Sequence, residues 1–341
     1  EDGIRDFCLS RGLGDVYKRQ GKYGIYVANY GGPTRFYEKY KSRIADRAKE
    51  FGLDKITGGR AVISGHILSD RSDIFAANER GVNFLYKNVK GTFYDVASSY
   101  KVLDPFENGR GTALADVLYR GQLDIVTGNW DGEHRIFVER NNVFEDIASE
   151  DFKKPSKIRT VIVADFDNDG YDEIFLNNIG EPNKLFKIKD KGQIEEIDIT
   201  LNSEANGLGT GAAVADIDKD GILELLIAHG ENGNQILTLY KADIKKTKNF
   251  IRIKALNKNG APARGATVTL ISNLRNHSKT IDSGSGYLCQ MEPVAHYGIR
   301  EGEKDFKVEI GWTNGKVNEY KIDEIGKTYT FKQSKLSISP S

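Results

Sequence analysis

One acidic segment occurs twice in this 341-residue chain, at residues 165–173 (DFDNDGYDE) and 216–224 (DIDKDGILE). Carboxylates at positions 1, 3 and 5 of such a loop can converge on one centre, and the glycine at position 6 permits a sharp turn. A carboxylate at position 9 completes an oxygen cage that suits a hard cation. Each copy therefore predicts a calcium site, because only a metal would balance so many negative charges.

The predicted ligand sets lie at positions 1, 3, 5, 7 and 9 of the two loops: Asp165, Asp167, Asp169, Tyr171, Glu173, Asp216, Asp218, Asp220, Ile222 and Glu224. An EF-hand would need a glutamate at position 12 and a helix on each side. Position 12 is Leu176 in one loop and Ile227 in the other, and the flanking apolar runs are typical of strands. The loops are therefore predicted to be turns between strands. The alternative is an ordinary acidic hairpin turn without a metal.

Asp172 lies one residue before the last carboxylate of the first loop. It could share in metal ligation, but we expect its side chain to face solvent.

The loops belong to a longer repeat, because position 9 recurs at intervals of 51, 49 and 51 residues, as Asp73, Asp124, Glu173 and Glu224. An apolar strand follows each of the first three positions, at 73–78, 124–129 and 173–178, and a turn and a second strand come next. An aromatic-acidic strand completes the first two of these units. Four strands in each repeat of this length are typical of a β-propeller blade. The segment 25–29 begins 49 residues before Ile74, so a fifth unit that lacks its first strand is predicted at the start.

Two of the four loops have lost the ligand pattern. The loop before Asp124 keeps Asp116 but has Leu118 and Arg120 at positions 3 and 5, and the loop before Asp73 keeps none of the first three carboxylates. Calcium is therefore predicted in two blades only, where it would stabilise turns and perform no chemistry.

The repeats resemble FG-GAP, or VCBS-type, propeller repeats over about residues 21–242, through the acidic turns and the Gly-rich segment 207–211. The remainder resembles the ASPIC and UnbV domain that follows such repeats in the cartilage acidic protein-like family. The segments that carry this second resemblance are 249–253 (NFIRI), 265–268 (GATV), 284–287 (GSGY), 296–298 (HYG) and 308–315 (VEIGWTNG). Arg300 stands where that domain usually has a glycine.

The resemblance implies an all-β fold with a propeller of about seven blades, followed by a small β domain. This chain would then form a partial, open propeller of four-stranded blades plus a β-sandwich-like C-terminal domain. The expected divisions are propeller repeats at 21–244, the ASPIC/UnbV-like domain at 245–333 and a tail at 334–341. Residues 1–20 read as a translated sequencing adapter and are predicted not to be native, so a signal peptide and earlier blades could precede Gly21.

Composition excludes several partners. The chain has 49 basic and 49 acidic residues, so no nucleic-acid footprint is visible. It has no apolar run of about 18 residues that could span a membrane. If Cys8 belongs to the adapter, Cys289 has no partner for an intrachain disulfide and is expected to be a small buried side chain.

No catalytic constellation is visible. The five histidines lack metal-ligand spacing, and the segment 207–211 leads into a strand, which argues against a phosphate cradle. His296 is expected to be a satisfied histidine at a strand end, and Trp312 to fill the core of the C-terminal domain. The sequon at Asn276 is expected to lie on an exposed hairpin loop.

Two function classes remain. The leading prediction is an extracellular or cell-surface calcium-binding propeller that acts in adhesion or binds a protein or glycan partner, without catalysis. The alternative is an enzyme with its active site in the central channel of the propeller, partly built by missing blades.

Overall fold

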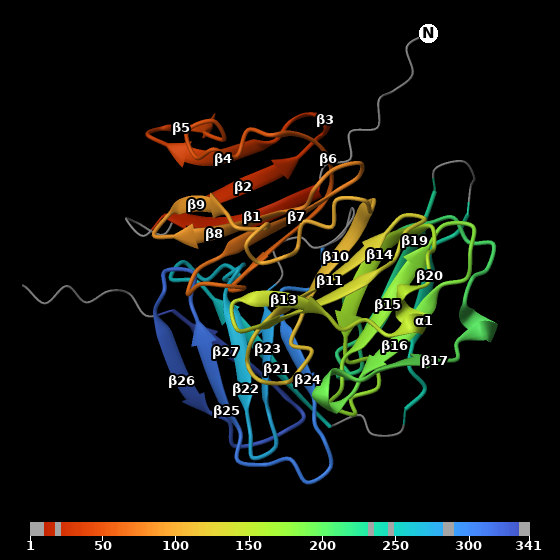
Figure 1. Ribbon diagram of the computed structural model, residues 1–341. Coiled ribbons are helices and arrows are strands. Elements are labelled where there is room, and N and C mark those ends of the chain that lie inside the picture. The colour runs from red at the N-terminus through yellow and green to blue at the C-terminus, as the bar shows by residue number, and fades with distance from the viewer. Residues whose placement is uncertain (1–9, 18–21, 231–234, 245–248, 282–289, 334–341) are drawn as a thin grey trace, which may run out of the picture.

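The chain forms strands almost throughout (Figure 1). This computed structural model describes residues 10–17, 22–230, 235–244, 249–281 and 290–333. Cys8, Cys289 and the segment 284–287 lie outside the described residues. Within them, the helices are α1 (Glu150–Lys153) and two short 3₁₀ turns at Asp190–Gly192 and Thr200–Asn202. None of the described helices has the length and apolar character needed to cross a bilayer.

The first five sheets follow one another along the chain, and we number them as blades 1 to 5. Blade 1 contains β1 (Ser10–Tyr17), β2 (Lys22–Ala28), β4 (Arg35–Tyr40) and β5 (Arg43–Asp46). Blade 2 contains β6 (Ile56–Gly65), β7 (Asp73–Asn78), β8 (Phe84–Val89) and β9 (Thr92–Asp95), with β3 (Tyr30–Pro33) added at the β6 edge. Blade 3 contains β10 (Gly109–Ala115), β11 (Asp124–Asn129), β12 (Arg135–Arg140) and β13 (Val143–Asp146). Blade 4 contains β14 (Ile158–Ala164), β15 (Glu173–Asn178), β16 (Lys184–Ile188) and β17 (Ile194–Ile197), and blade 5 contains β18 (Gly209–Ala215), β19 (Glu224–His229) and β20 (Thr238–Lys241).

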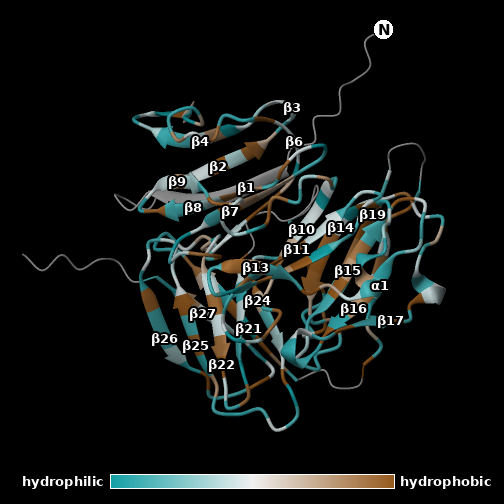
Figure 2. Ribbon diagram, viewed as in Figure 1, coloured by the Kyte–Doolittle hydropathy of each residue, from teal (hydrophilic) through white to brown (hydrophobic). Residues whose placement is uncertain are grey.

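The second strand of an inner blade is apolar on both faces, because one face of the blade packs on the preceding blade and the other face packs on the following blade. Successive residues of a strand point to opposite faces. Val126 of β11 and Ile174 of β15 share the core between blades 3 and 4, while the adjacent Ile125 packs towards blade 2 and Phe175 towards blade 5. These strands therefore read as continuous hydrophobic runs, and Figure 2 shows the hydrophobic residues of blade 4 along them.

The blades form an open arc, as expected. Among the described residues, no strand of blade 5 pairs with blade 1. Apolar side chains are exposed at both ends, including Ile44 in blade 1 and Leu239 in blade 5. The first unit is predicted to lack its first strand in the native chain from Gly21, and in the structure Ser10–Tyr17 pairs with β2 in that place as β1. This pairing has a simple cause: without β1, the edge of β2 would have free backbone N–H and C=O groups, and an adjacent segment of the chain can pair with them. That residues 1–20 are not native stays a prediction.

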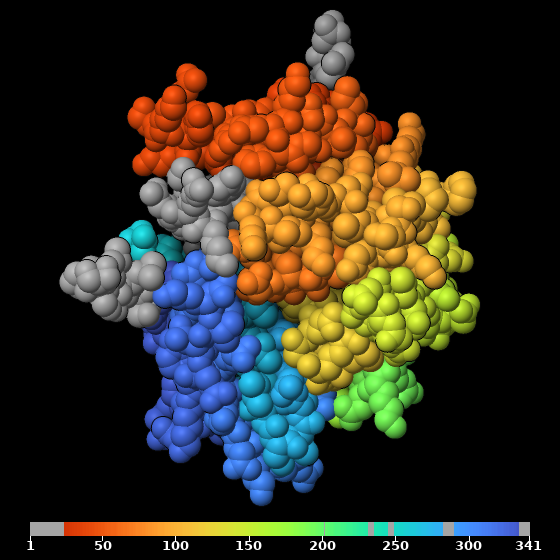
Figure 3. All heavy atoms as spheres, turned by 60° about the vertical axis from the view of Figure 1, so that its left-hand side comes forward, coloured from red at the N-terminus to blue at the C-terminus, as the bar shows by residue number. Residues whose placement is uncertain are grey.

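Two further sheets form the C-terminal domain. One has the order β24 (Ala295–Gly298), β21 (Phe250–Leu256) and β27 (Lys327–Lys332), and the other has the order β23 (Asn276–Thr280), β22 (Thr267–Ile271), β25 (Lys307–Gly311) and β26 (Val317–Lys321). They enclose one apolar core that includes the buried Trp312, as predicted. Figure 3 shows this domain packed against blades 2 and 3.

Candidate metal centres

The loops that join the first and second strands of blades 3, 4 and 5 share one backbone shape. Position 6 of each loop is a glycine with positive φ: 85° at Gly121, 86° at Gly170 and 87° at Gly221. Position 4 is also left-handed in all three loops. The glycine at position 6 is therefore explained by the turn itself, since other residues rarely adopt this conformation.

In blade 4, the loop gathers three of the predicted ligands. Oxygen atoms of Asp165, Asp167 and Glu173 lie within 4.8 Å of one another, and the two outer residues are buried. Asp169 lies beside them, where one carboxylate oxygen accepts the backbone N–H of Tyr171 at 2.9 Å. The phenol of Tyr171 points away to Asp190, so only the backbone of this residue remains close to the loop.

Blade 5 repeats the arrangement. Asp216, Asp218 and Glu224 also bring their oxygens within 4.8 Å of one another. Asp220 accepts the backbone N–H of Ile222 at 2.9 Å, as Asp169 does for the corresponding residue of blade 4. The two sequence copies are therefore two copies of one three-dimensional cluster.

Each cluster has a carboxylate oxygen that suits a bound cation. Asp165 Oδ1 and Asp216 Oδ1 are buried and accept no hydrogen bond. Burial, together with the neighbouring carboxylates, raises the pKa of Asp165 and Glu173 above the usual range. A buried anionic oxygen without a donor is unfavourable unless a cation compensates it, so the residues present fit a divalent ion.

A lysine from the third strand of the blade lies against each cluster. Lys187 Nζ is 2.8 Å from Asp167 Oδ2, 2.5 Å from Asp169 Oδ2 and 3.0 Å from Glu173 Oε1. In blade 5, Lys241 Nζ is 2.7 Å from Asp218 Oδ2 and 2.6 Å from Glu224 Oε1. The carboxylates hold the pKa of both lysines above the usual range, although burial opposes this.

The C-terminal domain contacts position 1 of three successive loops. Asp116 Oδ2 accepts the N–H of Ser278 at 3.0 Å, and Asp165 Oδ2 accepts the N–H of Gly298 at 3.0 Å. Asp216 Oδ2 pairs with Arg252, which also pairs with Glu292. In blades 4 and 5, the first aspartate thus uses Oδ2 for the C-terminal domain, while its Oδ1 has no hydrogen-bond partner.

The C-terminal domain also packs directly on the loop glycines. A Cβ atom at Gly170 would lie 2.5 Å from Cγ of Arg300, and one at Gly221 would lie 1.9 Å from the ring of Phe250. Arg300, which replaces the glycine usual in the domain, lies with its guanidinium 3.7 Å from the ring centroid of Tyr171. The interface therefore requires glycine at position 6 for space as well as for φ.

The expectation that Asp172 faces solvent is wrong. Its side chain is buried, with Oδ2 2.9 Å from His277 Nε2 and Oδ1 2.5 Å from Lys279 Nζ. Burial alone would raise the pKa of Asp172, but Lys279 and His277 together lower it well below the usual range. The C-terminal domain buries Asp172. A local sequence pattern cannot predict this burial, because the residues that contact Asp172 lie more than a hundred positions away in the sequence.

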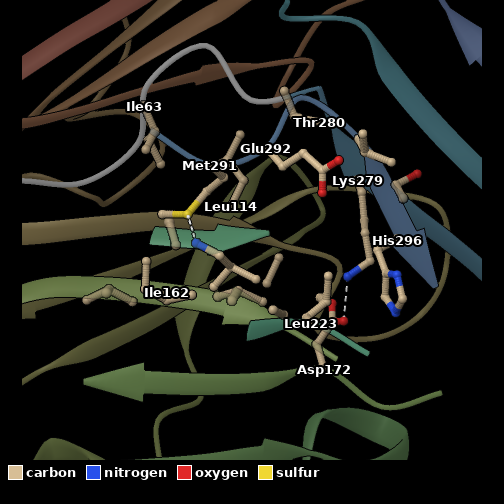
Figure 4. Close-up of a pocket in the computed structure, with 18 of the residues that line it drawn as sticks. Ile63, Leu114, Ile162, Asp172, Leu223, Lys279, Thr280, Met291, Glu292 and His296 are labelled. Carbon is tan, nitrogen blue, oxygen red and sulfur yellow. Dashed lines mark hydrogen bonds and ion pairs between the residues drawn. The ribbon is translucent and has the colours of Figure 1, made fainter. Parts of the chain in front are cut away.

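A cavity of about 130 Å³ lies between the first strands of the blades and the C-terminal domain (Figure 4). Ile63, Leu114 and Ile162 line it from the propeller side. Among the polar groups at its wall, Asp172 pairs with Lys279, and His296 Nε2 lies 2.7 Å from Asn168 Oδ1, whereas Thr280 Oγ1 is buried without a hydrogen-bond partner. The expectation of a satisfied histidine therefore holds for Nε2 of His296 only, because Nδ1 is buried without a hydrogen-bond partner.

The loops of blades 2 and 3 differ from these clusters. In blade 3, Arg120 Nη2 lies 2.9 Å from Asp124 Oδ1, so a cation of the loop itself neutralises the carboxylate. In blade 2, Asp73 accepts backbone N–H groups from Leu68, Ser69 and Asn88. Neither loop belongs to a cluster that could hold a metal among the described residues.

Sequence reasoning missed Lys187, Lys241 and Arg252. Lys187 follows Glu173 by 14 residues and Lys241 follows Glu224 by 17, so no fixed spacing marks the lysines in the sequence. The pairing of Glu173 with Lys187 and of Glu224 with Lys241 becomes visible only when the strand register is known. Asn276 is exposed, as expected, although it opens β23 and does not lie in the preceding loop. Its neighbour Ser278 is buried.

Comparison with known proteins agrees with this architecture. Residues 119–176 and 167–227 match the FG-GAP-like repeat, and residues 256–338 match the ASPIC and UnbV domain. The chain belongs to the family of β-propeller proteins in which FG-GAP-like repeats precede an ASPIC and UnbV domain.

Within this class, the chain is similar to cartilage acidic protein 1 of Homo sapiens, at 43% identity over 92% of this chain and 52% of that protein. It is equally similar to cartilage acidic protein 1 of Xenopus tropicalis, at 43% identity over 91% of this chain and 51% of that protein. The chain spans about half the length of these relatives. Among solved structures, it is similar to the Cps50 (Swd1) β-propeller domain of Myceliophteria thermophila, with a TM-score of 0.41, 11% identity and coverage of 71% of this chain and 72% of that one.

Proposed function

We propose that this chain is part of an extracellular, non-enzymatic propeller protein that binds calcium in the loops of blades 4 and 5. The ligands are the ten residues at positions 1, 3, 5, 7 and 9, with Tyr171 and Ile222 contributing backbone carbonyls. One observation carries the proposal: Asp165 Oδ1 and Asp216 Oδ1 are buried and lack a donor, and both residues belong to clusters of three carboxylates whose oxygens lie within 4.8 Å of one another.

Calcium in these loops would fasten the C-terminal domain to the propeller. The same two aspartates bind the C-terminal domain through Oδ2, at Gly298 and at Arg252. An ion that orders these carboxylates also orders the surface on which the domain rests. Calcium therefore acts here as a structural ligand of the folded state, which it stabilises by mass action.

The similarity to cartilage acidic protein 1 supports an extracellular location, and we propose adhesion, or the binding of a protein or glycan partner, as the role of the assembled surface. An enzyme of this fold would place its reactive groups on the first strands, facing the central channel. In this arc, the C-terminal domain covers those strands, and charged groups around the cavity are engaged in ion pairs, Arg252 with Glu292 and Lys279 with Asp172. This arrangement favours a binding role over catalysis.

Melting curves with calcium and with a chelator test the proposal. Calcium at about a hundred times its dissociation constant should stabilise each site by about 2.7 kcal/mol, which raises the Tm by several degrees. Asp167→Ala and Asp218→Ala should each reduce this gain. Asp116→Ala is the matched control, and it should lower the starting Tm without changing the gain. Identical curves with calcium and with chelator would contradict the proposal.

A further inference from the structure

We propose that Lys187 and Lys241 are internal competitors of calcium. Each ammonium group occupies its acidic loop in the calcium-free protein, and calcium binding expels it. This inference rests on the proposed calcium sites and adds the residues that set their affinity.

Both lysines lie directly on the carboxylates of their loops. Lys187 Nζ reaches oxygens of Asp167, Asp169 and Glu173, and its side chain is only 12% exposed. Lys241 reaches the same three loop positions in blade 5, where the farthest oxygen is 2.8 Å away, on Asp220. Two independent blades thus place a cation on the same set of oxygens.

Strand pairing holds each lysine beside its loop. Glu173 and Lys187 are directly opposite each other in the pairing of β15 with β16, and Glu224 and Lys241 are opposite in the pairing of β19 with β20. Opposite residues on one face of an antiparallel pair are close neighbours. The ammonium group is therefore always within reach of the loop when the blade is folded.

The same carboxylates cannot bind a calcium ion and an ammonium group at once. Calcium needs six to eight oxygen ligands, and Lys187 contacts the carboxylates of Asp167 and Glu173, two of the three residues that form the cluster. A divalent ion and an ammonium group on the same oxygens would also repel each other strongly in a half-buried site. Calcium binding must therefore release the lysine.

The competition has a functional consequence. The calcium-free loop keeps a positive charge and hence its fold, while the affinity for calcium is reduced by the work of breaking the lysine contacts. Affinities of about 10⁻⁴ to 10⁻³ M are typical of extracellular calcium modules, where the ion is abundant. The lysines would move the sites towards this range.

Calorimetric calcium titration of Lys187→Met and Lys241→Met tests the proposal. Each variant should bind calcium at the altered site at least about tenfold more tightly than the unaltered chain, since an ion-pair network no longer opposes it. Lys184→Met is the matched control, because Lys184 lies on the same strand β16 and contacts Glu196 instead of the loop. Its affinities should not change.

A second measurement uses the unaltered chain, so it does not depend on the folding of a variant. An amine-acylating reagent followed by mass spectrometry should modify Lys187 and Lys241 faster in calcium than in chelator, with Lys184 unchanged. Unchanged or weaker affinity in the methionine variants, or equal labelling with and without bound calcium, would overturn the competition while leaving the calcium sites intact. No binding heat in any chain would overturn the calcium sites as well.

Discussion

The loops of blades 3 and 4 have the same backbone turn but different sources of positive charge. In blade 3, Arg120 at position 5 of the loop pairs with the buried Asp124. In blade 4, position 5 is Asp169, and the positive charge comes from Lys187 on the neighbouring strand. A buried carboxylate at position 9 therefore needs a cation in either blade, and only the blade without an internal arginine has oxygens to offer a metal.

The two loops are also held differently by the C-terminal domain, and this difference should give the largest effect. Position 8 is Asp172 in blade 4, where it pairs with His277 and Lys279, whereas it is the apolar Leu123 in blade 3. Asp172→Asn should lower the free energy of unfolding by about 3–5 kcal/mol, because it leaves a buried cation without its partner. Asp198→Asn, at an exposed carboxylate of the same blade, is the control. Chemical denaturation measures both, and a loss below about 1 kcal/mol for Asp172→Asn would contradict this account.

The blades also differ in the turn after their second strand, where blade 3 has a buried histidine. This difference predicts that acid lowers the stability of blade 3. The residue that accepts the N–H of the last strand residue is Asn83 in blade 2 and Asn183 in blade 4, but His134 in blade 3. Burial lowers the pKa of His134 to about 4. The unfolded state therefore binds more protons between about pH 6.5 and 4, so that stability is present above pH 6.5 and lost as the pH falls.

The pH effect attributable to His134 should reach about 3 kcal/mol near pH 4. His134→Asn, which restores the residue of blades 2 and 4, should remove this part of the pH dependence of the unfolding free energy. The burial of His66 lowers its pKa in the same direction, so a smaller acid sensitivity should remain in the variant. Parallel pH profiles for the two chains would show that His134 is not the source.

A gain of calcium binding would sharpen the comparison, with a smaller effect on stability. The double variant Leu118→Asp and Arg120→Asp gives the blade 3 loop the carboxylates of blade 4 and removes its arginine. Because the turn already has its glycine at position 6, the loop should bind one additional calcium ion and gain about 1–3 kcal/mol of stability at saturating calcium. Binding stoichiometry measures this. An unchanged stoichiometry would mean that the blade 3 loop lacks a feature beyond its charges.

The strands and the loops could be predicted because their signals are local. The second strands of blades 2, 3 and 4 begin and end at the predicted residues, Asp73–Asn78, Asp124–Asn129 and Glu173–Asn178, since each is a short apolar run after an acidic turn. The acidic loops likewise carry their ligand spacing and their glycine within nine residues.

The surroundings of the loops could not be predicted, because they depend on distant pairing. Lys187 reaches the site through the register of two strands, and His277 reaches Asp172 across 105 residues. Asp116 persists in a loop that has lost the carboxylates of positions 3 and 5, and this persistence could have indicated a role for Asp116 other than metal binding. Its contact with Ser278 explains why a carboxylate at position 1 is useful without a metal.

The central claim is that blades 4 and 5 bind calcium and blade 3 does not. Equilibrium dialysis with radioactive calcium tests it most directly, because it counts bound ions without reference to stability. The account predicts two ions for the unaltered chain, one for Asp167→Ala or Asp218→Ala alone, none for the double variant and two for Asp116→Ala. No bound calcium in the unaltered chain, or an equal loss in Asp116→Ala, would contradict it.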